Sequence, residues 1–328
     1  MDFYGTLGGA CSTRATLDAL FAAGMTGARL NLSHTALTDC ADLLTGAFHP
    51  AARQAGLACP HLIIDLQGPE LRVGVLPSPV ELPEGGMVTL GEGGIPVPPI
   101  VLEAAQPGYQ LSLDDSALLL EVTENRSDAL ICKVLRGGTL KSRKSLAILG
   151  VQPDTPTLTE ADLVNLDHAA QFGVTHILQP FVRGKRDIET LRRALDERGL
   201  SHVQIMAKIE NRTGLDHLDE IIACADQVCI ARGDLGNSMP LWELPGVQKD
   251  IARRCREANR PFCLVTQLLW SMEQRPVPTR AEVLDIYNGV LDGADSLMLT
   301  GETAAGKYPV ESMDYLVKTA RCAMADIS

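Results

Sequence analysis

The sequence has few aromatic residues and no long apolar run. Phe, Trp and Tyr make up 4% of its 328 residues, so a hydrophobic core must consist mainly of Leu, Val, Ile and Ala. No apolar stretch approaches the roughly 18 residues of a membrane span, and residues 1–4 do not form the basic start of a signal peptide. We therefore expect a cytoplasmic protein that has no membrane partner.

Paired cysteines are also missing. The nine cysteines are scattered singly, and no two have CxxC spacing. This pattern argues against a disulfide framework and against a zinc site made of cysteines, and it is typical of reduced, buried thiols in a cytosolic protein. The seven histidines show no metal-ligand spacing either.

An excess of basic charge is the third absence. The chain has 29 Lys and Arg against 41 Asp and Glu, a net charge of -12. This balance argues against nucleic acid or an anionic membrane as the main partner. It does not exclude a small phosphorylated ligand, because a local cluster of Arg, Lys and metal can reverse the field inside a cleft.

Apolar runs alternate with amphipathic segments along most of the chain, which is typical of a parallel α/β fold. Eight strands and eight helices are expected, the number found in a (β/α)8 TIM barrel. The glycines at 5–9 lack the GxGxxG spacing of a dinucleotide-binding sheet, so we favour the barrel. The expected strands are 3–7, 27–30, 61–65, 176–179, 203–207, 227–231, 262–265 and 296–299, and the expected helices are 14–23, 37–55, 159–172 (opened by a capping-box-like 157–160), 186–197, 213–225, 244–258, 280–291 and 310–325.

The alternation stops after the third strand. Residues 73–138 are rich in Pro and Gly and contain short alternating runs such as 87–90 and 118–122, which predict a small β-rich domain. The barrel would then consist of residues 1–72 and 139–328. An insertion at this place can act as a lid over the catalytic face. A purely structural or interface role is the other interpretation; the charged residues at both junctions, Arg72 and Lys144 among them, favour the lid.

Two carboxylates, Glu210 and Asp234, follow the fifth and sixth expected strands. Lys208 and Arg232 lie beside them in the sequence. A barrel carries its chemistry on the loops after its strands, and this set suits a divalent cation that holds an anionic, oxygen-rich substrate. Each residue alone has a structural explanation, such as an ion pair, a turn or a helix cap. Their joint placement at one face of a barrel favours the functional interpretation.

Seven segments resemble the pyruvate kinase family in its own order, and together they cover nearly the whole chain. An eighth, 137–144 (GGTLKSRK), is similar to the stretch where the inserted lid of that family returns to the barrel. The seven segments are 28–34 (ARLNLSH), 65–72 (DLQGPELR), 208–211 (KIEN), 231–236 (ARGDLG), 266–272 (TQLLWSM), 278–282 (PTRAE) and 300–304 (TGETA).

The resemblance implies a glycolytic, ATP-binding transferase that moves the phosphoryl group of phosphoenolpyruvate to ADP, giving pyruvate and ATP. It implies Mg²⁺ or Mn²⁺ on Glu210 and Asp234, with Lys208 and Arg29 contacting the transferred phosphoryl group. For the substrate, the resemblance implies binding by Gly233 and Thr266 and a proton relay through Thr300. For the nucleotide and cofactors, it implies contact with the nucleotide phosphates by Arg72 and further cofactor contacts by Lys144 and His34. For K⁺, it implies K⁺ dependence through Glu70 and binding by Asn31, Ser33, Asp65 and the Leu66 carbonyl.

Several positions depart from the family pattern. Leu66-Gln67 replaces Thr-Lys, Gly9 replaces Pro, Ala305 replaces Lys, and 147–150 replaces Asn-Leu-Pro-Gly. These changes affect the nucleotide side of the cleft more than the metal side. A second hypothesis is therefore a divalent-metal-dependent lyase or decarboxylase that acts on a pyruvate-like 2-oxo acid without nucleotide. A third is a non-catalytic binding protein that senses such an acid or acts as a scaffold for a partner.

The sequence ends at Ser328, directly after the last expected helix. The C-terminal regulatory domain of the family has no counterpart in it, so we expect neither allosteric activation through that domain nor oligomers built on it. A homo-oligomer formed through barrel helices is compatible with the sequence.

Overall fold

The computed structural model describes residues 1–33, 35–114, 117–151 and 153–327. The chain forms two compact units, one of residues 1–68 and 157–328 and one of residues 69–156. The second unit is longer than the expected 73–138 insertion, because strands near residues 139 and 147 pair with strands inside it. The two units are described separately.

The first unit contains a closed barrel of eight parallel strands, so the predicted (β/α)8 TIM barrel is confirmed. Neighbouring strands around the barrel follow one another in the chain, apart from the closure between the first and the last. The strands are β1 (Asp2–Thr6), β2 (Gly27–Asn31), β3 (His61–Asp65), β11 (His176–Gln179), β12 (Gln204–Ile209), β13 (Gln227–Ala231), β14 (Phe262–Val265) and β15 (Ser296–Met298). All eight were expected from their apolar runs, because parallel strands are covered on both faces.

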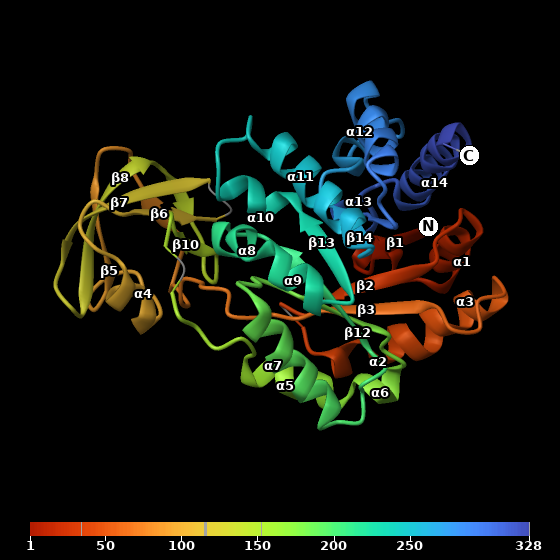
Figure 1. The fold of residues 1–328 in the computed structure, drawn as a ribbon. Helices are drawn as coiled ribbons and strands as arrows, with labels where there is room; N and C mark the ends of the chain where they lie inside the picture. Colours follow the sequence, from red (N-terminus) through yellow and green to blue (C-terminus); the bar gives the residue numbers. More distant parts are fainter. Residues whose placement is uncertain (34, 115–116, 152, 328) are drawn as a thin grey trace. The chain divides into compact units, whose positions relative to one another are not determined.

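Helices surround these strands (Figure 1). The long helices are α1 (Arg14–Ala22), α7 (Lys185–Asp196), α11 (Leu244–Glu257), α12 (Arg280–Leu291) and α14 (Pro309–Ile327). Two expected helices are each broken in two: α5 (Glu160–Asp167) with α6 (Ala169–Phe172), and α8 (Arg212–Asp216) with α9 (Leu218–Cys224).

The expected helix 37–55 is not a single α-helix. It consists of η2 (Leu37–Cys40), α2 (Ala41–Leu43), the π-helical η3 (Leu44–Phe48) and α3 (His49–Gln54). Pro50 has no amide hydrogen, so it cannot continue the ladder of α-helical hydrogen bonds at the point where the π turn ends. The capping box before α5 was also misassigned: its residues are Thr159 and Asp162 rather than 157 and 160.

Four short helical segments of the first unit were not predicted. They are η1 (Gly9–Cys11), α10 (Arg232–Asn237), η4 (Trp270–Glu273) and α13 (Gly301–Ala304). Three of them follow strands β1, β13 and β15 within three residues, at the ends where a barrel carries its chemistry. Glycines within α10 and α13 weaken the helical signal in the sequence.

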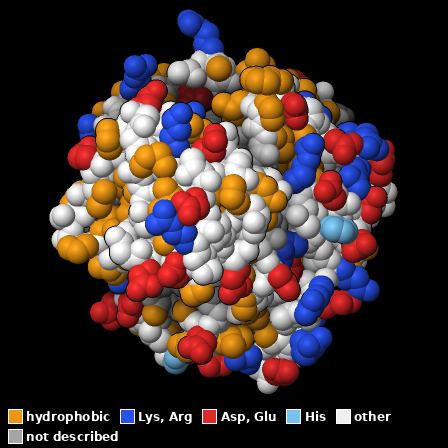
Figure 2. Space-filling model, turned by 90° about the vertical axis from the view of Figure 1, so that its left-hand side faces the viewer, with side chains coloured by type: hydrophobic (Ala, Val, Ile, Leu, Met, Phe, Trp, Pro, Cys, Tyr) orange, Lys and Arg blue, Asp and Glu red, His pale blue; other side chains and the backbone are white. Residues whose placement is uncertain are grey.

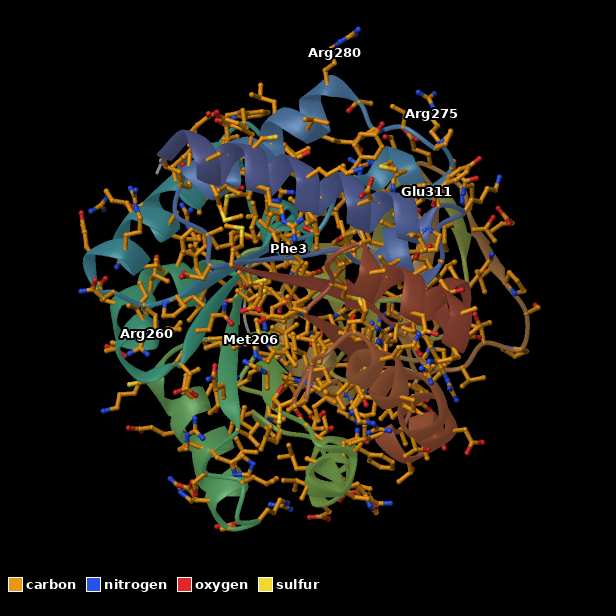
Figure 3. The ribbon with its side chains drawn as sticks, turned by 90° about the vertical axis from the view of Figure 1, so that its right-hand side faces the viewer. Phe3, Met206, Arg260, Arg275, Arg280 and Glu311 are labelled. Atoms are coloured by element: carbon orange, nitrogen blue, oxygen red, sulfur yellow. The ribbon has the colours of Figure 1, made fainter. Side chains whose placement is uncertain are left out.

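The first unit has two apolar cores. Side chains inside the barrel, including Met206 and Met298, form the smaller one, and a larger core lies between strands and helices. Figure 3 shows Phe3 and Met206 within the ring of helices, while Arg275 and Arg280 point outward. The barrel interior is therefore a packed core, as expected for eight strands.

The second unit is built on antiparallel sheets and contains its own core. One sheet has five strands in the order β10-β6-β7-β8-β5, and the other pairs β4 with β9. Its elements are β4 (Val80–Leu82), β5 (Met87–Gly91), α4 (Pro99–Ala104), β6 (Gln110–Leu113), β7 (Leu118–Asn125), β8 (Ala129–Arg136), β9 (Gly138–Leu140) and β10 (Leu146–Ile148). The β-rich character predicted for this part of the chain is present in the structure.

Figure 2 shows acidic and basic side chains interspersed over the face that it presents, with neither sign gathered into one field. Within the described residues, no helix has the length and apolar character needed to cross a membrane.

Candidate active site

The parallel strands bring their carboxyl ends to one face of the barrel. Asp65 is the last residue of β3 and is paired in register with Asn31 at the end of β2. Lys208 lies in β12, in register with Cys229 of β13. Residues that are far apart in sequence therefore meet where a barrel carries its chemistry.

Four charged side chains form a continuous chain of ion pairs at this face. Arg29 Nε and Nη2 lie 2.9 and 2.6 Å from Asp65 Oδ2. Lys208 Nζ lies 3.5 Å from the same oxygen and 2.7 Å from Glu210 Oε1. Asp65 and Glu210 are 2% and 3% exposed, so two buried carboxylates are balanced by two cations.

Each charge alters its neighbours. Burial lowers the pKa of Lys208, but the carboxylates of Asp65, Glu210 and Asp234 outweigh it and raise that pKa overall. Lys208 therefore remains an ammonium. Burial raises the pKa of Glu210 to about 8, against the influence of Lys208, and Asp234 adds to the rise. The repulsion between Glu210 and Asp234 is the kind that a cation between two carboxylates relieves.

One oxygen of each carboxylate in these ion pairs can accept a further ligand, such as a metal ion. Asp65 Oδ1 is buried and accepts no hydrogen bond within the described residues. Glu210 Oε1 has only the ion pair with Lys208. Buried carboxylate oxygens with one protein partner or none are suitable ligands for hard cations such as Mg²⁺, Mn²⁺ and K⁺. The expected metal ligands therefore fit such ions.

The described residues contain no group of three or more His, Cys, Asp and Glu side chains suited to a metal ion. A divalent cation on Glu210 and Asp234 would complete its coordination with oxygens of a substrate and water, as Mg²⁺ commonly does.

Two residues that support these ion pairs were not predicted from the sequence. Phe181 has φ +53°, and its amide N–H donates to Glu210 Oε2 at 2.8 Å. Thr6 Oγ1 accepts from Arg29 Nη1 at 3.1 Å and donates to the Leu299 carbonyl at 2.8 Å. Phe181 contributes its backbone, and Thr6 lies within an expected strand, so neither gave a signal in the sequence.

Thr266 has a strained backbone. Its φ is +73° and that of Gln267 is +53°, a region that β-branched residues rarely adopt. The Thr266 hydroxyl is buried without a hydrogen bond among the described residues. Such strain often marks functional sites, so the structure supports a role for Thr266 beyond packing.

Arg232 holds this strained residue in place. Its Nη2 donates to the Thr266 carbonyl and its Nη1 to Asp285 Oδ2, each at 2.6 Å. Gly233 lies beside the same residue, because a β-carbon added there would be 3.6 Å from Thr266 Cγ2. The loops after β13 and β14 are thereby joined.

Thr300 is linked to the loop after β14 by Glu302, which is 1% exposed. Glu302 Oε2 accepts from the Thr300 amide at 2.7 Å and from its hydroxyl at 3.2 Å. Glu302 Oε1 accepts from the Leu269 amide at 3.0 Å. A buried carboxylate therefore fixes the Thr300 hydroxyl.

The structure places the other expected residues as follows. Asn31 Oδ1 accepts from the Ser33 amide at 3.1 Å, and Leu66 is buried directly after Asp65. His34 lies outside the described residues.

Arg72 and Lys144 belong to the second unit. There Arg72 pairs with Glu70 at 2.6 Å, and Lys144 pairs with Asp114 at 2.7 Å.

Comparison with known proteins identifies the family. The family description "Pyruvate kinase, barrel domain" matches residues 2–313. The chain belongs to the pyruvate kinase family. Family membership, predicted from seven segments, is thus confirmed.

Curated relatives agree with this assignment. The chain is 38% identical over 319 residues to a pyruvate kinase of Aeropyrum pernix, covering 95% of this chain and 68% of that protein. It is 38% identical over 321 residues to one of Agrobacterium vitis, covering 95% and 65%. A pyruvate kinase of Geobacillus stearothermophilus is 35% identical, with 94% and 54% covered. The chain therefore spans between about half and two thirds of the length of these relatives.

A solved structure is also similar. The crystal structure of a pyruvate kinase from Cryptosporidium parvum superimposes with a TM-score of 0.91 at 29% identity, covering 99% of this chain and 69% of that one. The fold of the whole chain, including its β-rich second unit, is therefore that of a pyruvate kinase.

Proposed function

We propose that this chain transfers the phosphoryl group of phosphoenolpyruvate to ADP, with a divalent and a monovalent cation as cofactors. The observation that carries the proposal is the series of ion pairs from Arg29 through Asp65 and Lys208 to Glu210, in which Asp65 Oδ1 is buried without a hydrogen bond among the described residues. Phosphoryl transfer depends mainly on positioned charge.

Glu210 and Asp234 are the residues we assign to Mg²⁺ or Mn²⁺. Such a cation, when bound, polarises the oxygens of its substrate and neutralises the charge that develops during the reaction. Lys208 and Arg29 supply the fixed positive charge for the transferred phosphoryl group. Asp65 and Glu210 already orient the Arg29 and Lys208 side chains. These two side chains therefore need little reorganisation when the substrate binds.

Thr266 and Thr300 are the hydroxyl residues of the proposal. The Thr266 hydroxyl, which is buried and has no hydrogen bond to any described residue, is available to the carboxylate of phosphoenolpyruvate or pyruvate, next to Gly233. The Thr300 hydroxyl donates to Glu302 and is the group we assign to the relay that delivers a proton to the methylene carbon.

The monovalent site is assigned to Asn31, Ser33, Asp65 and the Leu66 carbonyl, with K⁺ as the ion. Their donor atoms are all oxygens, which suits an alkali cation. Arg72, Lys144 and His34 stay predictions for binding the nucleotide and cofactors, as does the effect of Glu70 on K⁺ dependence. A cytoplasmic location and a homo-oligomer through barrel helices also stay predictions.

The test is a coupled assay of pyruvate formation from phosphoenolpyruvate with ADP, Mg²⁺ and K⁺. The wild type is compared with Lys208→Met and with Lys318→Met. Lys318 is an exposed lysine that pairs with Asp314 at 2.7 Å on α14, so it controls for the loss of an ion-paired lysine. We expect turnover in the wild type and in Lys318→Met, and a loss of about 10²–10³-fold or more in Lys208→Met.

Absence of turnover in the wild type would contradict the proposal. If Mg²⁺-dependent binding of oxalate were then still measurable, the lyase or decarboxylase hypothesis would take its place.

A further inference from the structure

Asp162, in the first turn of α5, is 0% exposed and accepts four hydrogen bonds. Its Oδ1 accepts from the Gln67 amide at 2.8 Å. Its Oδ2 accepts from the Gly68 amide at 3.1 Å and from the amide and hydroxyl of Thr159, each at 2.8 Å. A cap alone uses only the Thr159 contacts, so this carboxylate also fixes the loop that follows β3.

The hydrogen bond to Gln67 determines the direction of the Leu66 carbonyl. The C=O of one residue and the N–H of the next share a planar trans peptide and point in opposite directions. Because the Gln67 N–H points to Asp162, the Leu66 oxygen points away from α5. A carboxylate acceptor also polarises the peptide and makes that oxygen a stronger ligand for a cation.

The same loop is confined from another side. Gly68 has φ +60°, and a β-carbon added there would lie 2.4 Å from Pro180 Cγ. Pro180 precedes Phe181, whose amide holds Glu210. The peptide that carries the Leu66 carbonyl is therefore held by Asp162 and by the closely packed turn at Gly68.

A second polar side chain of α5 supports the neighbouring loop. Asn165, one turn after Asp162 and 3% exposed, accepts from the Leu37 amide at 2.8 Å. Leu37 follows the segment that contains Asn31 and Ser33. One face of α5 thus holds the segments that follow β2 and β3, and the four residues assigned to the monovalent cation lie at the ends of these two strands or directly after them.

We propose that Asp162 is a positioning residue that sets the affinity for the monovalent cation through the 66–67 peptide. The inference rests on the proposed function, in particular on the assignment of the Leu66 carbonyl to that cation. Asp162 itself does not contact the ion; it orients the ligand that does.

The test is Asp162→Asn. An amide has one acceptor oxygen, which will turn to the three donors at the Oδ2 position and leave its NH₂ facing the Gln67 N–H. The variant therefore keeps the cap and breaks the bond to the 66–67 peptide. Loss of an outer partner of a ligand typically weakens metal binding 10–100-fold, so we expect the K⁺ midpoint to rise at least tenfold.

Two readouts give that midpoint. One is the K⁺ concentration that produces half of the K⁺-dependent rise in melting temperature, measured at constant ionic strength with tetramethylammonium as the replacing cation. The other is the K⁺ concentration for half-maximal pyruvate formation. The Mg²⁺ midpoint should not change, whereas a general loss of stability would shift the K⁺ and Mg²⁺ midpoints alike.

Glu282→Gln is the matched control. Glu282 Oε2 accepts from the amide and hydroxyl of Thr279 and from the Ser271 hydroxyl, while Oε1 accepts from the Ser271 amide at 2.7 Å. The substitution makes the same chemical change at the capping box of α12. Its K⁺ midpoint should equal that of the wild type.

The outcomes separate the two proposals. A K⁺ midpoint for Asp162→Asn equal to that of the wild type, with turnover intact, overturns the inference and leaves the proposed function standing. If the wild type shows a K⁺-dependent melting temperature but no turnover, the proposed function is contradicted. The K⁺ midpoint obtained from the melting temperature of Asp162→Asn then still tests the role of Asp162. If neither the melting temperature nor the turnover of the wild type depends on K⁺, the inference is overturned.

If Asp162→Asn does not fold, Gly68→Ala is measured in its place, because it displaces the same peptide. An unchanged K⁺ midpoint in Gly68→Ala overturns the inference.

Discussion

Arg29 donates two hydrogen bonds to a single oxygen of Asp65, Oδ2, while the other oxygen is buried and accepts none from the part of the chain that the structure describes. A guanidinium and a carboxylate commonly pair through both oxygens. Here Lys208 shares Oδ2 instead, at 3.5 Å. Both positive charges are thus gathered on one side of the carboxylate, and Oδ1 remains for a cation.

The first prediction concerns Arg29. Arg29→Lys keeps the charge but cannot supply the two donors to Asp65 together with the bond to Thr6. We expect kcat/KM for phosphoenolpyruvate to fall by about 10–100-fold, a loss of about 1.4–2.8 kcal/mol in transition-state stabilisation. Steady-state kinetics at saturating ADP measures this.

Arg14→Lys is the control for Arg29→Lys. Arg14 pairs with Asp18 on α1 and donates to Gln54 of α3, and neither partner belongs to the ion pairs of the candidate site. Its kcat/KM should match that of the wild type. Equal losses in the two variants would contradict the role given to Arg29.

The second prediction concerns the strain at Thr266. Thr266→Gly removes a β-branched side chain at φ +73° and a buried hydroxyl that has no hydrogen-bond partner among the described residues. Strain of this kind costs about 1–3 kcal/mol, and glycine costs about 0.5–1 kcal/mol in entropy. We expect the free energy of unfolding in urea to rise by about 1 kcal/mol while turnover falls by at least about tenfold.

Asn259→Gly separates relief of strain from function. Asn259 also has positive φ, +50°, in the turn after α11. Its substitution should leave turnover unchanged. A Thr266→Gly variant that is both less stable and fully active would show that the strain serves no function.

The third prediction concerns Glu210. Glu210→Gln removes a buried carboxylate assigned to the divalent cation and leaves the Phe181 amide with an acceptor. We expect Mn²⁺ affinity in the presence of oxalate to fall by about tenfold or more, measured by electron paramagnetic resonance of free Mn²⁺. Glu311→Gln, on the exposed start of α14, should bind Mn²⁺ as the wild type does. Equal Mn²⁺ affinities in all three proteins would contradict the assignment of Glu210 to the divalent cation.

The fourth prediction concerns the opposite end of the barrel. His61 accepts or donates a hydrogen bond with Tyr4 at 2.9 Å, and its ring lies 4.7 Å from that of His176. Burial lowers the pKa of His176 to about 4, and His61 adds to the effect, although Gln204 and two nearby aspartates oppose it. His176 is therefore neutral in the folded protein at neutral pH.

The sign of the resulting pH dependence follows from linkage. Between about pH 6.5 and pH 4 the unfolded state binds a proton at His176 that the folded state does not, so stability falls as the pH falls through this window, by up to about 3 kcal/mol. We expect His176→Gln to flatten the decline in urea-unfolding free energy over this range. His202→Gln, at an exposed position, should retain the wild-type slope. Identical slopes in all three proteins would contradict the prediction.

The barrel could be predicted from the sequence because buried parallel strands appear as uninterrupted apolar runs, such as 61–65 and 227–231. Arg29, Asp65, Lys208 and Glu210 were found for the same reason, since charged residues at or beyond the ends of such runs are conspicuous. The structure brings these four together.

Other parts of the site could not be found in this way. Phe181 acts through a backbone amide, and the strain at Thr266 is a backbone conformation, so neither depends on a residue type that signals chemistry. Asp162 was expected only as part of a helix, because its partners Gln67 and Gly68 lie about 95 residues earlier. Helix α10 was missed because its glycines weaken the helical pattern.

The measurement that tests the central claim most directly is phosphorus NMR of phosphoenolpyruvate with ADP, Mg²⁺, K⁺ and the wild-type chain. The account predicts that the phosphoenolpyruvate signal declines while the three signals of ATP grow in equal amount, and that neither change occurs when Mg²⁺ is chelated. Release of inorganic phosphate without ATP, or an unchanged spectrum, would contradict phosphoryl transfer to the nucleotide.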